Sequence, residues 1–145
     1  MKPEFWAILT ALCWGGGSLL EKRGVKAGNL APVMGTAVRT AFSLVLLLLL
    51  SVPFWGQVRS AGTKSILLIA LGGGVLAGGL GVICLYTGLK HGNLSTVLTL
   101  AFCCAPVVGG LLGYFLLHEK LSLGQAIGAA LCIAGAGMTI YFKRH

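Results

Sequence analysis

The sequence predicts an all-α integral membrane protein, a single domain over residues 1–145 built as a bundle of five transmembrane helices. Composition is the first reason: 57% of the 145 residues are hydrophobic and 10% are charged, with a mean hydropathy of +0.93, far more apolar than a soluble domain. The second reason is that the charged residues gather in short clusters between long apolar runs, as loops beside membrane spans do. The third is the length of those runs.

The apolar runs are long enough to cross a bilayer. Because the hydrocarbon core is about 30 Å thick and a helix rises about 1.5 Å per residue, a span needs about 20 mostly apolar residues. Unpaired backbone groups cannot lie in lipid, and these runs are too continuous for barrel strands, so each is predicted to be a helix. The five predicted helices cover residues 5–20, 32–52, 65–87, 94–117 and 123–142.

The first two predicted helices each contain a candidate functional residue. In the first, Trp14 precedes three glycines, which suits either the wall of a substrate cavity or a plain packing cluster. The second begins at Pro32 and ends before Pro53, both favourable boundary positions for proline. It carries Arg39 about two turns in, where an ionisable group faces a cavity or a partner unless it reaches to the nearer interface.

The last three predicted helices are rich in glycine and contain two further candidates. Tyr86 lies near the end of the third, where it can face a cavity mouth. Pro106 interrupts the fourth, and broken helices in transporters often lie near the substrate path. Glycines four residues apart share one helix face and allow close approach of a neighbour, so these helices are expected to pack tightly. The pairs are Gly74 and Gly78, Gly109 and Gly113, and Gly124 and Gly128.

The sequence does not favour an enzyme, a metal-binding protein or a nucleic-acid-binding protein. It has no Asp, and its three histidines lie at loops or ends, so no catalytic set, metal site or cofactor is predicted. The net charge of +8 comes from clusters beside the apolar runs, which indicates membrane loops rather than nucleic-acid binding. Glu21 follows the first apolar run and precedes Lys22 and Arg23, so we interpret it as a solvated interfacial charge rather than a buried proton carrier.

Several short motifs follow one another in a familiar order. Residues 94–143 combine a mid-helix Pro106, Glu119 in a tight loop, and a last helix with Gly128 and Gly135. The first half contains "ALCWGGGSLLEKRGV" and "AVRTAF", a Trp-Gly first helix and an Arg in the second. Over almost its full length the chain resembles one EamA-like repeat of the drug/metabolite transporter superfamily.

This resemblance implies a function. Members generally carry two such repeats, inverted relative to each other, in ten helices around a substrate cavity, and export metabolites. This chain resembles half of such a transporter, which implies a small-molecule substrate bound at Trp14, Arg39, Tyr86 and Pro106 and moved by alternating access. Arg39 would favour a carboxylate or phosphate. The related small multidrug resistance proteins use a mid-membrane Glu in helix 1, which is absent here, so export of cationic drugs is not expected.

The loop charges bear on how one repeat could function. Five spans would place the Lys and Arg residues in two nearly balanced sets, four on one side and six on the other. The sets are Lys2, Arg59, Lys64 and Lys120 against Lys22, Arg23, Lys26, Lys90, Lys143 and Arg144. Two copies inserted in opposite orientations would recreate the inverted pair, so we expect an antiparallel homodimer in the inner (cell) membrane. The alternative is a non-transporting subunit that docks on another membrane protein through its glycine faces.

Overall fold

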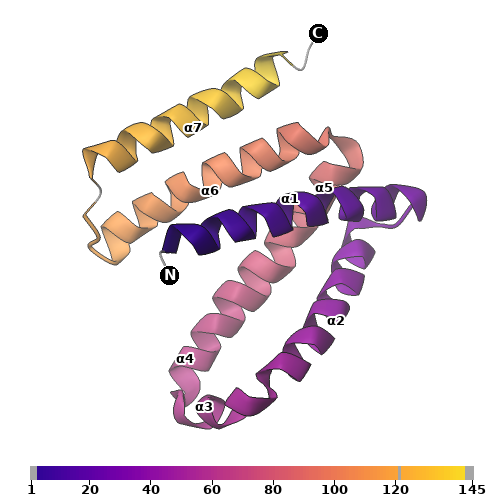
Figure 1. Cartoon of the computed structure of the whole chain (residues 1–145), viewed down its shortest axis with the longest axis vertical. Coiled ribbons are helices and arrows are strands. Elements are labelled where there is room, and N and C mark those ends of the chain that lie inside the picture. Colours follow the sequence, from indigo (N-terminus) through magenta and orange to yellow (C-terminus); the bar gives the residue numbers. More distant parts are fainter. Residues whose placement is uncertain (1–2, 121, 143–145) are drawn as a thin grey trace. The chain divides into compact units, whose positions relative to one another are not determined.

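The computed structural model describes residues 3–120 and 122–142 (Figure 1). Three of the loop charges counted above, Lys2, Lys143 and Arg144, lie outside these ranges. All secondary structure in the described ranges is helical, as predicted. The chain divides into two compact units, Met1–His91 and Gly92–His145, and each is described by itself.

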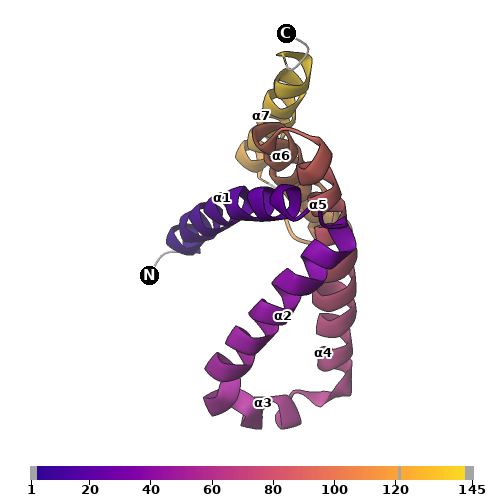
Figure 2. The same ribbon diagram turned by 90° about the vertical axis from the view of Figure 1, so that its right-hand side faces the viewer.

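The first unit packs three long helical segments near one end. Helix α2 lies against α5, and α1 contacts both. Figure 2 shows α2 and α4 diverging from this end toward the short helix α3, which joins them. The elements are α1 (Pro3–Ala27), α2 (Pro32–Ser51), η1 (Val52–Phe54), α3 (Trp55–Ser60), α4 (Gly62–Ile69), η2 (Ala70–Gly81) and α5 (Val82–His91).

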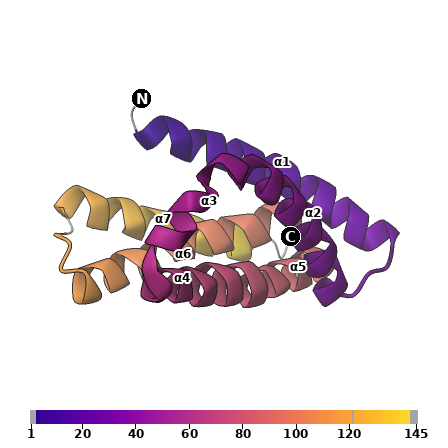
Figure 3. The same ribbon diagram turned by 90° about the horizontal axis from the view of Figure 1, so that it is seen from below.

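A tight connection joins α1 to α2 (Figure 3). Asn29 has a positive φ of 45°, and its N–H donates to the Lys26 carbonyl at 3.2 Å while the Leu30 N–H donates to the Val25 carbonyl at 3.1 Å. This pattern is a Schellman motif, which satisfies the last carbonyls of a helix. Lys90 of α5 donates to the Leu30 carbonyl at 2.9 Å. The connection is therefore held from within and from the neighbouring helix.

The packed centre of this unit is small and depends on one glycine. Val25, Val82 and Tyr86 are each at most 4% exposed and form a cluster. A Cβ atom at Gly35 would lie 2.6 Å from Cδ1 of Tyr86 and 3.0 Å from Cγ2 of Val25. Because real Cβ atoms cannot approach so closely, α2 can lie on the tyrosine ring only with glycine at this position.

The third predicted helix, residues 65–87, is part of one continuous helical segment from Gly62 to His91. Its middle, η2, is a π-helix of 12 residues, although π-helices usually occur as single turns. A Cβ at Gly78 would lie 2.7 Å from the Gly73 carbonyl oxygen, one π-turn earlier. The glycine-rich composition of η2 therefore makes room for the wide turn itself.

The second unit is a helical hairpin of α6 (Leu94–Leu116) and α7 (Leu123–Tyr141), which lie side by side (Figure 1). Pro106 lies inside α6, as predicted. A reciprocal capping box begins α7, because Ser122 Oγ accepts from the Gln125 N–H and Gln125 Oε1 accepts from the Ser122 N–H. Such a box satisfies two backbone donors that a helix start leaves open.

Four helical segments in the described ranges are long and apolar enough to cross a membrane. They are Pro32–Val58, Gly62–His91, Leu94–Leu116 and Leu123–Tyr141. Helix α1 has 25 residues, enough length for a span, but it is not among the four, and charged residues occupy its last two turns. The structure therefore supports a multi-pass helical membrane protein with four apolar spans, and α1 differs from them in composition.

Candidate functional site

An ion pair between two helices is the centre of the candidate site. Arg39 Nε of α2 lies 3.0 Å from Glu21 Oε1 of α1, with the two side chains 30% and 21% exposed. Arg39 lies two turns into α2, at the depth predicted, because Pro32 begins the helix. An arginine in an apolar helix is costly unless a partner meets its charge, and Glu21 supplies that partner.

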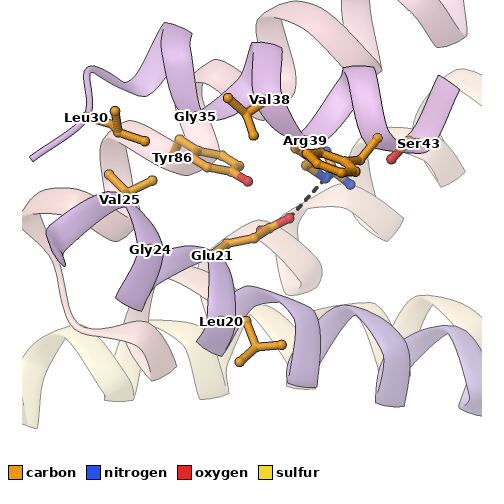
Figure 4. Close-up of a pocket in the computed structure, with 11 residues that line it drawn as sticks. Leu20, Glu21, Gly24, Val25, Leu30, Gly35, Val38, Arg39, Ser43 and Tyr86 are labelled. Atoms are coloured by element: carbon orange, nitrogen blue, oxygen red, sulfur yellow. Dashed lines mark ion pairs between the residues drawn. The ribbon is translucent and has the colours of Figure 1, made fainter. Parts of the chain in front are cut away.

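Two aromatic side chains complete the surroundings of the pair. The Trp14 ring lies under the Arg39 guanidinium, with 5.6 Å from Cζ to the ring centroid, a cation–π distance. Tyr86 is 3% exposed, and its hydroxyl points toward the Glu21–Arg39 pair (Figure 4). The tyrosine ring is positioned by Gly35, as described above, so α1, α2 and α5 each place one side of the site.

The pair lies in the wall of a cavity of about 670 Å³ whose lining is otherwise mainly apolar (Figure 4). Among the described residues, Glu21 and Arg39 are the charged groups that line it. The lining residues are Leu20, Glu21, Gly24, Val25, Leu30, Gly35, Val38, Arg39, Phe42, Ser43 and Tyr86. Such a cavity can hold a small molecule with one anionic group and an apolar body.

Arg39 also borders a second, smaller cavity in the same unit. This space of about 320 Å³ has a polar wall from α2, with Thr36, Thr40 and Ser43, and a glycine wall from η2. Gly74 and Gly78 both belong to the glycine wall, together with Gly73 and Gly79. The first predicted glycine pair thus faces α2 across a cavity.

The structure brings together three of the four predicted substrate-binding residues. Arg39 forms the ion pair, and Trp14 and Tyr86 (Figure 4) lie beside it, whereas Pro106 belongs to the second unit and lines cavities of about 410 and 270 Å³ there. Glu21 was not predicted as a site residue, and its interpretation as a solvated charge is wrong because Arg39 binds it. Its spacing from Trp14 could have indicated a role in the site, since residues 14 and 21 are two turns apart on one helix face.

The remaining predicted glycine pairs differ in their surroundings. A Cβ at Gly109 or Gly128 would meet nothing within 4 Å, and one at Gly124 would reach only Ser122 Oγ at 4.0 Å. A Cβ at Gly113 would lie 2.9 Å from Glu119 Oε2. Gly35, which no spacing pattern singled out, closely approaches Tyr86 of another helix. Among the described residues, no group of three His, Cys, Asp or Glu side chains is arranged to hold a metal ion.

Comparison with protein families identifies the family of the chain. A model of the EamA-like transporter family matches residues 1–141. The chain belongs to the EamA-like transporter family. The match confirms the resemblance to a single EamA repeat of the drug/metabolite transporter superfamily. Comparison with curated proteins gave no match, and comparison with solved structures gave none.

Membership of the EamA family and the four apolar segments agree with each other. The protein is a multi-pass membrane protein of a transporter family. Its substrates are small molecules, as for transporters of this superfamily.

Proposed function

We propose that this EamA-family chain transports small organic anions that carry an apolar body. The Arg39–Glu21 pair in the wall of the 670 Å³ cavity carries this proposal. Ionisable residues within membrane helices are rare and commonly mark substrate pathways.

The donors of Arg39 favour an oxyanion as the recognised group. Glu21 contacts the Nε position of the guanidinium, which has five N–H donors in a planar fork. The remaining donors can bind a carboxylate or phosphate in the bidentate geometry typical of arginine. The apolar lining, including Val25, Val38 and Tyr86, suits the hydrocarbon part of the same molecule.

We further propose that five helices, α1 included, cross the inner membrane and that two antiparallel copies complete one exporter. One EamA repeat supplies half of the inverted pair on which alternating access depends. The near balance of loop charges is compatible with insertion in both orientations. Open faces at Gly109 and Gly135 leave room for a second copy to approach.

The substrate class can be tested with paired ligands that differ only in charge. We would measure binding of hexanoate and phenylacetate, and of their neutral amides, to the purified chain by thermal stabilisation. Both acids should stabilise the protein while the amides should not. The Arg39→Lys variant should bind the acids more weakly, and the Arg39→Gln variant should not respond to them. Equal stabilisation by the amides, or an unchanged response of Arg39→Gln, would overturn the proposal.

The antiparallel arrangement requires its own measurement. Reporter domains fused after residue 145, one active only inside the cell and one active only outside, should both give signals from the same chain. A signal from one reporter alone would exclude dual insertion. The same open glycine faces also suit the second candidate function, a subunit that docks on a different membrane protein. Constant copurification with one other polypeptide, without binding of the acids, would favour that candidate.

A further inference from the structure

The turn between α6 and α7 folds the side chain of Glu119 back onto α6. His118 has a positive φ of 55°, and the N–H groups of Leu117 and Glu119 both donate to the Gly113 carbonyl, at 3.0 and 3.1 Å. Gly113 is buried, and a Cβ there would lie 2.9 Å from Glu119 Oε2. The backbone and the glycine together place this carboxylate against the helix.

The carboxylate borders a cavity with a polar end and an apolar floor. Glu119, Lys120 and Gln125 line one end of this space of about 410 Å³, and its floor consists of small residues and Pro106. No ion pair to Glu119 is formed within residues 3–120 and 122–142. A negative and a positive side chain therefore border one cavity without neutralising each other.

The lining of the cavity runs from the turn between α6 and α7 to Pro106 in the middle of α6. The turn joins two apolar spans, so Glu119 and Lys120 lie at the level of lipid headgroups. Pro106 lies ten residues before Leu116, the last residue of α6, which is about 15 Å along a helix axis and half of the hydrocarbon core. The cavity, called the groove below, thus has the length of one lipid leaflet.

We propose that this groove binds one phospholipid that carries a primary ammonium headgroup, of the phosphatidylethanolamine class. Glu119 accepts hydrogen bonds from the ammonium group, and Lys120 pairs with the phosphate. One acyl chain lies along the small residues of the floor, among them Gly110 and Gly128, toward Pro106. This site lies wholly in the second unit and does not depend on the proposed anion transport.

The alternatives within lipid chemistry fit the charges less well. Phosphatidylcholine has a quaternary nitrogen without N–H groups, so it cannot donate hydrogen bonds to Glu119. Phosphatidylglycerol has no cationic group, and its negative charge would meet the Glu119 carboxylate. Since a hydrogen bond to a charged group is among the stronger ones in proteins, we expect about tenfold preference for the ethanolamine lipid.

The test uses the full chain in detergent and native mass spectrometry. Palmitoyl-oleoyl lipids with ethanolamine, choline and glycerol headgroups are titrated separately, and bound copies are counted. We expect one copy of the ethanolamine lipid to bind about tenfold more tightly than the others. Equal binding of the three lipids would overturn the site, and so would a second copy of the chain that excludes lipid from it.

Variants connect the preference to Glu119. Glu119→Gln should bind all three lipids alike, and Lys120→Gln should weaken all three. Gly113→Ala should displace the carboxylate and also remove the preference, while the matched control Gly109→Ala, whose new methyl group meets nothing within 4 Å, should retain it. Should Gly113→Ala fail to fold, Glu119→Gln still decides. If the Glu119→Gln variant still prefers the ethanolamine lipid, Glu119 does not recognise the headgroup.

Discussion

Arg39 and Glu21 show how a membrane helix can hold a charged side chain. Each side chain retains partial exposure to the cavity, 30% for Arg39 and 21% for Glu21. Each also removes most of the cost of the other, because an unpaired charge in an apolar environment is more unfavourable than a pair. Trp14 covers one face of the guanidinium. The pair is therefore partnered and still partly exposed to the cavity.

This mutual dependence predicts the outcome of a double-mutant cycle. Arg39→Gln alone should lower the free energy of unfolding by about 1–3 kcal/mol, because Glu21 is left without its partner. Arg39→Gln combined with Glu21→Gln should recover part of that loss, with a coupling energy of about 0.5–3 kcal/mol. Thermal unfolding of the four proteins in one detergent measures the coupling. Additive effects would mean that the ion pair makes no net contribution.

Gly35 provides a second prediction at the scale of single residues. Gly35→Ala places a methyl group within 2.6 Å of the Tyr86 ring, and overpacking of this kind costs about 1–3 kcal/mol. The matched control is Gly15→Ala, where the new methyl group meets nothing within 4 Å. Melting temperatures of the two variants provide the comparison. If the Gly35→Ala and Gly15→Ala variants have the same melting temperature, the packing of α2 does not depend on this contact.

At the scale of the element, η2 is the least regular part of the first unit. Its 12 residues form a π-helix, a wider turn than the α-helix. The wide turn displaces the glycines of η2 from α-helical positions, and four of them border the smaller cavity beside Arg39. We infer that the geometry of η2 controls the width of that cavity.

Two substitutions distinguish the effect of the π-turn on stability from the effect of losing a glycine. Gly78→Ala places a methyl group 2.7 Å from the Gly73 carbonyl oxygen, so the turn must change, at a cost of about 1–3 kcal/mol. Gly74→Ala meets nothing within 4 Å and should be neutral or stabilising by up to about 1 kcal/mol, since Ala favours helices. Thermal melts in detergent compare them. Equal melting temperatures would argue against a strained π-turn at Gly78.

At the scale of the whole molecule, the proposed antiparallel dimer depends on the balance of loop charges. Lys64→Gln with Asn93→Lys changes the proposed count of basic residues from four against six to three against seven, which should fix one orientation. The combination Lys22→Gln, Lys26→Gln, Gln57→Lys and Ser60→Lys reverses the excess. Each set alone should abolish transport of the acid that binds, and coexpression should restore it. Full transport by either set alone would exclude the antiparallel dimer.

The sequence by itself determined the class of protein, the places of its apolar helices and its family. Those conclusions depend on composition, run length and short motifs, which are local properties of the chain. It also singled out Arg39 and Trp14 as candidate site residues. A charged or large aromatic residue inside an apolar helix can be recognised from the sequence alone. The count of five spans stays a prediction, because α1 combines span length with charged residues at its end.

Only the tertiary structure decided which residues meet. Glu21 resembles an interfacial charge in the sequence, and its role depends on the angle at which α1 lies against α2. Gly35 lies outside every four-residue glycine spacing, yet it is where Tyr86 packs on α2. Glu119 looks like an ordinary loop residue until the turn at His118 folds it onto Gly113. Each of these contacts joins residues on different elements or across a turn. Hydropathy and periodicity do not predict where a backbone turns or how closely two helices approach, so these contacts could not be predicted from the sequence.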